Sequence, residues 1–284
     1  MTAQLPRDLG NQVAAALLED VGSGDVTARL VPEDQQVRGR VITREDAVLC
    51  GQAWVDETFR RLDSTIDIEW HANDGDRIRA EQIIFQISGR ARPVLTGERT
   101  ALNFLQLLSG TATQVRRYVD AVSGTRCTIL DTRKTLPGLR TAQKYAVLCG
   151  GAQNLRIGLF DMVLIKENHI AAAGSISRAI AAAKATAPGV KIEVEVENLS
   201  GLEEALAAEP DIIMLDNFSN AEMKEAVDFA RARSKTVRLE ASGNVTLEGV
   251  RAVAQTGVDY ISIGSLTKHV RAVDLSMRLE FTAG

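Results

Sequence analysis

The chain has 284 residues, of which 45% are hydrophobic and 25% are charged, so it is long and apolar enough to bury one large or two ordinary domain cores. Its formal net charge is -4, whereas a nucleic-acid-binding protein normally carries a basic overall balance, so we expect no nucleic-acid partner. The first residues contain no apolar signal core, and no apolar run approaches the roughly 20 residues of a membrane span. We therefore expect a cytoplasmic protein with no membrane partner.

The N-terminal third predicts a helix followed by a small antiparallel sheet. Residues 9–20 carry apolar side chains at helical spacing, and the glycine-rich residues 22–27 favour an ordinary turn over a phosphate-binding loop. Residues 37–51 and 64–89 alternate apolar and polar side chains around a turn at residues 73–76, as the strands of hairpins do.

A second helix is predicted from Thr96, and it is apolar on most sides between Ala101 and Leu108, so we expect it to be buried. Arg99 would lie in its first turn, where a cation opposes the helix dipole. Two interpretations remain open, because Arg99 could pair with Glu98 or could serve a ligand.

The metal-ligating residue types show no recognisable spacing. Cys50, Cys127 and Cys149 contain no C-x-x-C pair, which argues against a disulfide framework and against a thiolate metal site. The three histidines also lack a ligand spacing, and His169 favours a loop or capping role.

From residue 127 onward, six apolar strand segments alternate with alanine-rich helical patterns, which predicts a parallel sheet. A possible seventh strand lies near Asn154 to Gly158. Each strand ends in polar residues or glycine on its carboxyl side, where α/β barrels and open sheets bind their ligands. No G-x-G-x-x-G motif follows a strand, so we predict an α/β fold with an open or incomplete α/β barrel.

Cations gather between residues 131 and 166 of this acidic chain, which indicates a small anionic ligand. Pro137 is predicted to open a helix that Gly150 and Gly151 close. The six cations of this segment are Arg133, Lys134, Arg140, Lys144, Arg156 and Lys166.

Carboxylates and glycines follow the later strands. Glu193, Glu195 and Glu197 share one strand face, which points either at solvent or into a barrel mouth. Asp216 follows an unbroken apolar run and suits sugar hydroxyls, or Mg²⁺ held through water. The turns of the last two strands are typical of phosphate binding, although ordinary strand-to-helix turns would look the same. Those turns contain Ser242, Gly243, Asn244, Gly264 and Ser265.

Taken together, these residues predict a site for a phosphorylated sugar beside an acidic small molecule. The chain also resembles the quinolinate phosphoribosyltransferase family over nearly its whole length. The segments that carry the resemblance are EDVGSGDVT, GERTALNFLQLLSG, DTRKTLPGLR, KYAVLCGG, LIKENHI, VEVEVEN, IIMLDNF and ISIGSLTKHV. The resemblance implies phosphoribosyl transfer from phosphoribosyl pyrophosphate to quinolinate with decarboxylation, giving nicotinate mononucleotide, pyrophosphate and CO2. It also implies a homodimer or an assembly of dimers with composite sites.

The resemblance further implies roles for individual residues. Quinolinate binding would fall to Arg133, Lys134 and Arg156, with Arg99 reaching in from a neighbouring subunit, and Thr132 would also bind substrate. Lys134, Lys166, Glu195 and Asp216 would be catalytic, and the last two would meet the ribose hydroxyls and Mg²⁺. The 5'-phosphate cradle would be Ser242 to Asn244 with Gly264 and Ser265.

Two further expectations concern organisation and substrate choice. We predict an N-terminal α+β sandwich-like domain over residues 1–112, with dimer and substrate contacts, and a barrel domain over residues 113–284 whose last helix returns to the first domain. Leu155 stands where the family usually has histidine, which removes one donor from the cationic pocket. Two alternatives therefore remain: a relative of the molybdenum-locus type with another acidic acceptor, and a non-catalytic anion-binding protein.

Overall fold

The computed structural model describes residues 4–282. The chain divides into two compact units, and each unit is assembled from more than one segment. The first unit contains Thr135–Gly151 together with the described residues of Met1–Arg116 and Leu266–Gly284. The second unit contains Arg117–Lys134 and Ala152–Ser265. The division into residues 1–112 and 113–284 stays a prediction about domains.

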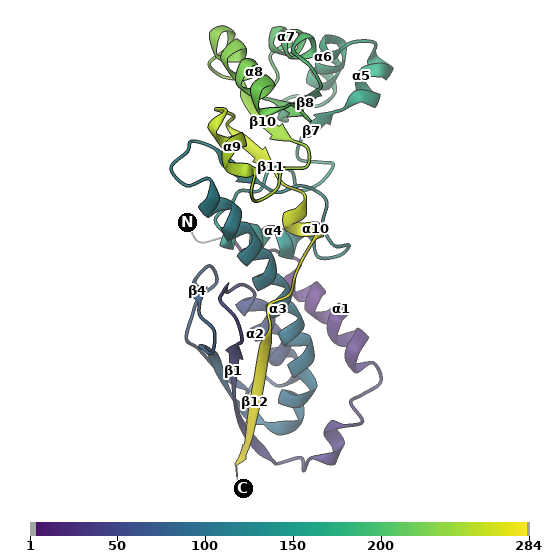
Figure 1. Cartoon of the computed structure of the whole chain (residues 1–284). Coiled ribbons are helices and arrows are strands. Elements are labelled where there is room, and N and C mark those ends of the chain that lie inside the picture. The colour runs from purple at the N-terminus through teal and green to yellow at the C-terminus, as the bar shows by residue number, and fades with distance from the viewer. Residues whose placement is uncertain (1–3, 283–284) are drawn as a thin grey trace. The chain divides into compact units, whose positions relative to one another are not determined.

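The first unit is built on an antiparallel sheet, as the alternating N-terminal segments predicted. Its strand order is β12 (Leu275–Thr282), β1 (Gln36–Thr43), β5 (Ile83–Arg90) and β3 (Asp67–Trp70). Two short strands, β2 (Ala47–Val48) and β4 (Arg77–Ile78), form a separate antiparallel pair. Figure 1 shows β12 beside β1, with which it pairs along its whole length.

The last element of the described chain is strand β12, which follows helix α10 (Ser265–Lys268). Leu275, Met277 and Leu279 recur at every second position and pack against the core of this sheet, which is the spacing of a strand. The C-terminal strand thus joins the fold of the N-terminal part of the chain.

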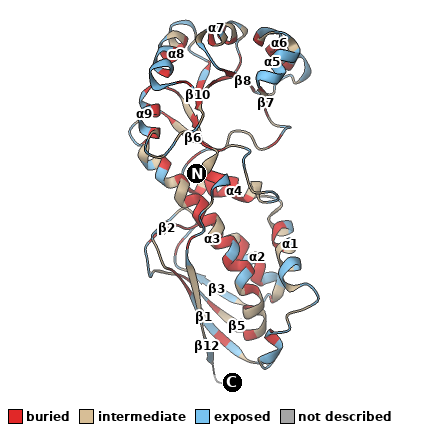
Figure 2. Ribbon diagram, turned by 45° about the vertical axis from the view of Figure 1, so that its right-hand side comes forward, coloured by how far each residue is buried: buried red, intermediate tan, exposed pale blue. Residues whose placement is uncertain are grey.

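The first unit also contains helices, two of which pack on this sheet. They are α1 (Leu9–Val21), the 3₁₀ segment η1 (Ala28–Leu30), α2 (Gln52–Leu62) and α4 (Arg140–Cys149); α3 (Ala91–Ala121) begins here, and α10 (Ser265–Lys268) follows the last strand of the second unit. Side chains of α2 and α3, among them Phe59 and Leu105, are buried in one cluster with Val41 and Phe85 of the sheet. Figure 2 shows how much of α2, α3 and α4 is buried.

Two predicted helix starts are wrong by several residues. The helix predicted from Thr96 begins at Ala91, because Pro93 is tolerated in a first turn, where its missing N–H has no partner to lose. The helix predicted to open at Pro137 begins at Arg140. Gly138 has a φ of 77°, which is outside the helical range, so the residues before Arg140 form a turn instead.

The second unit is a parallel sheet, and all six predicted strands are present. Their spatial order is β6 (Thr128–Leu130), β11 (Tyr260–Ser262), β10 (Arg238–Ser242), β9 (Ile212–Asp216), β8 (Ile192–Val196) and β7 (Val163–Ile165). The connecting helices are α5 (Glu167–Ala173), α6 (Ile176–Thr186), α7 (Leu199–Ala208), α8 (Asn220–Arg233) and α9 (Val250–Gln255). The helices α5 to α8 lie outside the strands in Figure 1. Because β6 and β7 stand at opposite ends of the order, the barrel is open, as predicted.

The possible seventh strand near Asn154 to Gly158 is absent from this part of the described chain. In its place, Gln153 makes a single parallel bridge to Leu130, and the following residues form an irregular loop. Across residues 4–282, no helix combines the length and the apolar character that crossing a bilayer would require.

Candidate active site

The carboxyl ends of the parallel strands carry most of the residues that the sequence singled out. Lys166 directly follows β7, Glu195 is the fourth residue of β8, Asp216 ends β9, and Ser242 ends β10. Asp216 and Ser242 face each other in the β9–β10 register. Since the carboxyl ends of parallel strands lie on one side of a sheet, these residues share one side of the second unit.

Lys166 and Glu195 form an ion pair in which the lysine Nζ lies 2.6 Å from the glutamate Oε2. The glutamate side chain is only 8% exposed and the lysine side chain is 48% exposed, so Glu195 is buried while Lys166 is accessible to a ligand. Burial alone would lower the pKa of Lys166, but the hydrogen bond and charge of Glu195, together with the charge of Asp216, raise it. Lys166 therefore stays cationic.

The alternating acids of β8 divide between two environments. Glu193 and Glu195 are buried, whereas Glu197, just past the strand, is exposed. The alternative in which these acids all point at solvent is thus wrong for the two within the strand. Their burial follows from the fold, because the face that carries them is the inner face of a curved parallel sheet.

Glu240 on β10 was not recognised from the sequence, and it lies with Glu193. Both side chains are completely buried, and three of their four carboxylate oxygens accept no hydrogen bond among the described residues. Burial raises the pKa of Glu240 to about 7, helped by the charge of Glu195 and opposed by the nearby side chains of Ser262 and Glu193. Burial, and then the charge of Glu240, also raise the pKa of Glu193. The available signal was an acid between the apolar residues Leu239 and Ala241 in the middle of a strand.

Lys134, which follows β6, lies against the turn after β11. Arg133 and Lys134 are exposed, and the Lys134 backbone N–H donates to the Thr132 hydroxyl at 3.1 Å. A Cβ placed on Gly264 would come within 2.8 Å of Lys134 Cδ, so the glycine leaves room for the lysine side chain. Two segments that are distant in the sequence thus meet at one point of the site.

Arg156 lies on the irregular loop and shares its surroundings with Arg133. The loop is held by Asp161, whose two oxygens accept the N–H groups of Ile157 and Gly158 at 2.8 and 2.9 Å. Burial lowers the pKa of Arg156, and the nearby positive charge of Arg133 lowers it further. Two guanidinium groups that repel each other in this way favour a bound dianion.

The turns after β9 and β10 have unusual backbone geometry. Gly243 has a φ of 104°, and Asn217 and Asn244 have φ values of 58° and 45°. A Cβ on Gly243 would lie 2.4 Å from the Oδ1 of Asn217, so only glycine fits this approach. Residues held in such conformations cluster at ligand-binding sites, where exposed N–H groups can close on an anion.

Arg99 belongs to the first unit, in the third turn of α3 rather than in the first. It is exposed and lines a pocket of about 560 Å³ between α3 and the segment that joins α1 to η1. The pocket rim carries Val26 and Leu30, which are 74% and 83% exposed. Apolar side chains left so exposed around a cation are typical of an interaction surface.

Across both units, the fold and these residues define an α/β-barrel protein whose strand ends can bind an acidic, phosphorylated small molecule. The comparisons with known proteins make this more specific. Residues 25–109 match the profile of the quinolinate phosphoribosyl transferase N-terminal domain, and residues 111–278 match the C-terminal domain of the same family. The chain belongs to the quinolinate phosphoribosyltransferase family.

Individual relatives agree with this assignment. The chain is 43% identical to the nicotinate-nucleotide pyrophosphorylase (carboxylating) of Mycobacterium leprae, covering 94% of this chain and 95% of that protein. It is 40% identical to quinolinate phosphoribosyltransferase (decarboxylating) 1b of Nicotiana tabacum, covering 96% and 83%. A solved nicotinate-nucleotide pyrophosphorylase from Francisella tularensis superposes with a TM-score of 0.92 at 46% identity, covering 99% of each chain.

Proposed function

We propose that this protein transfers the phosphoribosyl group of phosphoribosyl pyrophosphate to the ring nitrogen of quinolinate. The products are nicotinate mononucleotide, pyrophosphate and CO2, which is a step of NAD biosynthesis. The observation that carries the proposal is the Lys166–Glu195 pair at the strand ends, with Asp216 close enough to act on Lys166. A cytoplasmic location is part of the same proposal.

Quinolinate is a planar dianion, and its two carboxylates would be held by Arg133, Lys134 and Arg156, with Thr132 beside them. Guanidinium groups bind carboxylates in a bidentate manner, which fixes the plane of the ring as well as its position. The mutual repulsion of Arg133 and Arg156 supports this assignment, because a dianion placed between them relieves it.

The phosphoribosyl side of the site would use the later strands. Ser242, Gly243 and Asn244, with Gly264 and Ser265, would hold the 5'-phosphate through backbone N–H groups. As the bond from the ribose carbon to pyrophosphate breaks, Lys166 would stabilise the negative charge that develops on the leaving group. The carboxylates of Glu195 and Asp216 would stabilise the ribosyl carbon as it becomes positive.

Glu195 and Asp216 are also the residues that would hold Mg²⁺. Two carboxylates are too few for an all-protein cage, but they suit magnesium, which keeps waters and takes further oxygens from substrate phosphates. The bound ion would neutralise charge on the departing pyrophosphate.

Decarboxylation follows from the first step. Attack by the ring nitrogen makes the ring a cationic pyridinium, which accepts the electron pair left when the carboxylate beside the nitrogen departs as CO2. A proton from solvent then replaces the carboxylate on that carbon, so the atoms and charges balance. No additional catalytic residue is needed for this step.

Each site would be completed by Arg99 of the partner subunit in a homodimer. The exposed apolar residues Val26 and Leu30 beside Arg99 support a surface that another subunit covers. In a two-fold dimer the same surfaces meet reciprocally, so both sites would be composite.

The test is to incubate the protein with phosphoribosyl pyrophosphate, Mg²⁺ and either quinolinate or nicotinate, and to identify the products by mass spectrometry. We expect nicotinate mononucleotide from quinolinate and none from nicotinate. Leu155 favours one second candidate, a relative that uses another acidic acceptor, and failure with quinolinate together with retained binding of phosphoribosyl pyrophosphate would support it. If the protein neither converts quinolinate nor retains binding of phosphoribosyl pyrophosphate, the remaining alternative is a non-catalytic anion-binding protein.

A further inference from the structure

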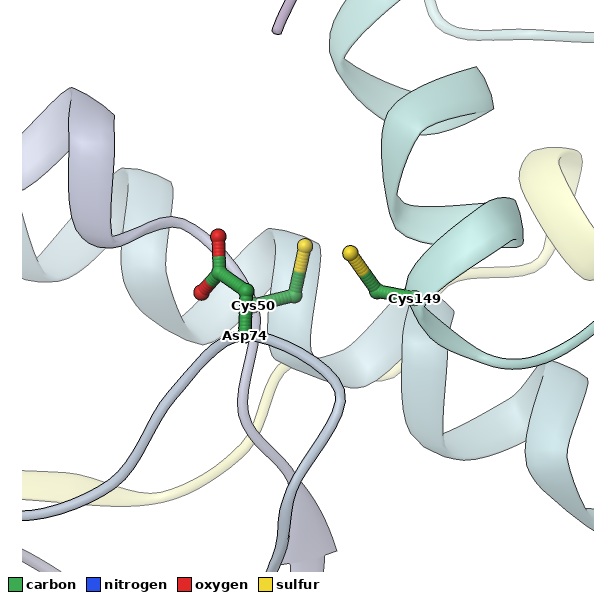
Figure 3. Close-up of side chains that lie close together, drawn as sticks. All are labelled: Cys50, Asp74 and Cys149. Atoms are coloured by element: carbon green, nitrogen blue, oxygen red, sulfur yellow. The ribbon is translucent and has the colours of Figure 1, made fainter. Parts of the chain in front are cut away.

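Three potential metal ligands from separate parts of the chain meet in the first unit. Cys50 precedes α2, Asp74 lies in the turn between β3 and β4, and Cys149 ends α4. Their ligand atoms, two sulfurs and one carboxylate oxygen, all lie within 4.8 Å of one another. Figure 3 shows the two sulfurs side by side, with the carboxylate of Asp74 on the other side of Cys50. The spacing of the cysteines in the sequence does not reveal this cluster, because the three segments become neighbours only through folding.

The carboxylate of Asp74 is held in place by its own hydrogen bonds. Its Oδ1 accepts the backbone N–H groups of Gly51 and Gln52 at 2.9 and 3.2 Å, and its Oδ2 accepts the Tyr145 hydroxyl at 2.8 Å. Each carboxylate oxygen offers about two acceptor positions, so Oδ2 retains one for another partner. Metal-ligating carboxylates are oriented by outer hydrogen bonds of this kind.

The two thiols also have an ordinary structural role, since they lie in an apolar cluster with Trp54, Leu108 and Tyr145. A buried free cysteine behaves as a small hydrophobic side chain. That role does not explain why a carboxylate lies within reach of both sulfurs, because each of the three groups becomes negative on ionisation. Burial raises the pKa of Cys50, and the neighbouring Cys149 and Asp74 raise it further. A bound dication would offset the repulsion between the three ionised groups.

We propose that Cys50, Asp74 and Cys149 form a binding site for one thiophilic divalent cation of the Zn²⁺ type. Zinc accepts two sulfurs and one carboxylate oxygen with water in the fourth position. With a Zn–S distance of about 2.3 Å, tetrahedral ligand atoms lie roughly 3.5 to 4 Å apart, so the three groups need to close by only about 1 Å. The cation binds as each thiol loses its proton, so one Zn²⁺ replaces two protons. The bound ion would fasten the turn at Asp74 and the end of α4 to the start of α2.

The test titrates the reduced, chelator-treated protein with Cd²⁺ and follows the ultraviolet charge-transfer absorption of the sulfur–cadmium bond. We expect saturation at one Cd²⁺ per chain with two protons released. Cys50→Ala and Cys149→Ala should each weaken binding by about 100-fold or more, and Tyr145→Phe by about 10- to 100-fold, as for other outer-shell changes. Cys127→Ala is the matched control, because Cys127 is also a buried free cysteine but lies in the second unit, and it should bind Cd²⁺ like the wild type.

Cys50 is fully buried, so a variant at this position can fail to fold. Measurements on the wild type test the proposal without relying on that variant. The ¹¹³Cd resonance of the loaded protein should report two sulfur ligands, and Zn²⁺ should raise the melting temperature of the wild type but not of Cys149→Ala. Absence of the charge-transfer band in the wild type at equimolar Cd²⁺, or a band that survives in folded Cys149→Ala, would overturn the proposal. Neither readout depends on phosphoribosyl transfer.

Discussion

Lys166 Nζ lies 2.6 Å from Glu195 Oε2 across the ends of the neighbouring strands β7 and β8. The register of these strands pairs Ile165 with Val194, so the residues that follow each of them are also neighbours. The pair thus holds a lysine ammonium group at the mouth of the open barrel, with its counter-ion buried beneath it.

Lys166→Ala should lower kcat by about 10²-fold or more, because it removes one fixed positive charge from the place where negative charge develops. The measurement is steady-state kinetics at saturating substrates, with folding confirmed by thermal melting. Lys224→Ala is the matched control, since Lys224 also lies 2.6 Å from a carboxylate oxygen, that of Asp228, but on exposed helix α8. An unchanged kcat in folded Lys166→Ala would remove this lysine from the mechanism.

Gly243→Ala should raise KM for phosphoribosyl pyrophosphate by about tenfold while leaving KM for quinolinate nearly unchanged. The added Cβ would lie 2.4 Å from Asn217 Oδ1, so the turn proposed to bind the 5'-phosphate has to move. Gly189→Ala controls for backbone strain, because Gly189 has a φ of 80° but open space around it. Both variants should lose about 1 kcal/mol of stability from the positive φ alone. Equal KM values in both variants would show that this turn does not bind the phosphate.

Glu240→Gln should stabilise the protein at pH 8 and change little at pH 4. The pKa of Glu240 in the folded chain is about 7, above the ordinary glutamate value of 4.5, so folding favours its protonated form. The contribution of Glu240 to stability is therefore greatest below pH 4.5 and falls as the pH rises toward 7, by on the order of 1 to 3 kcal/mol. Glutamine does not ionise, so Glu240→Gln should not lose stability in this way as the pH rises.

Urea unfolding of wild type and Glu240→Gln across this pH range measures the effect, with exposed Glu225→Gln on α8 as the control. The groups that face Glu240 are Glu193, Glu195 and Ser262, and their contributions should be common to wild type and variant. A stability difference that does not vary with pH would mean that Glu240 does not titrate in this range.

Arg99→Ala and Lys134→Ala homodimers should each be nearly inactive, yet their heterodimer should recover about half of the wild-type activity. In a two-fold dimer with shared sites, one site of the heterodimer carries both substitutions and the other carries neither. Two different affinity tags allow the heterodimer to be purified before its activity is measured. Heterodimers as inactive as their parents would place Arg99 in the site of its own subunit.

Much of the second unit could be predicted because each strand is a short apolar run that ends in polar residues. The alternation with alanine-rich helices then indicated a parallel sheet, and the carboxyl-end rule placed Lys166, Asp216 and Ser242 on one side. The residues between strands were less predictable. The loop around Arg156 looked like a strand, but its geometry is set by Asp161, whose two hydrogen bonds no periodicity reveals.

The features that sequence reasoning missed depend on contacts between distant segments. Glu193 and Glu240 come together because both point inward from a curved sheet, and Cys50 and Cys149 because α4 packs near the start of α2. Strand β12 was missed as well, although Leu275, Met277 and Leu279 alternate with other residues in the sequence.

The most direct test of the proposed reaction follows quinolinate labelled with ¹³C in the carboxylate beside the ring nitrogen. We expect labelled CO2 only when phosphoribosyl pyrophosphate and Mg²⁺ are present, with one CO2 and one pyrophosphate released for each nicotinate mononucleotide formed. Lys166→Ala should slow all three products together. Labelled CO2 released without phosphoribosyl pyrophosphate, or pyrophosphate released from the complete mixture without CO2, would contradict it.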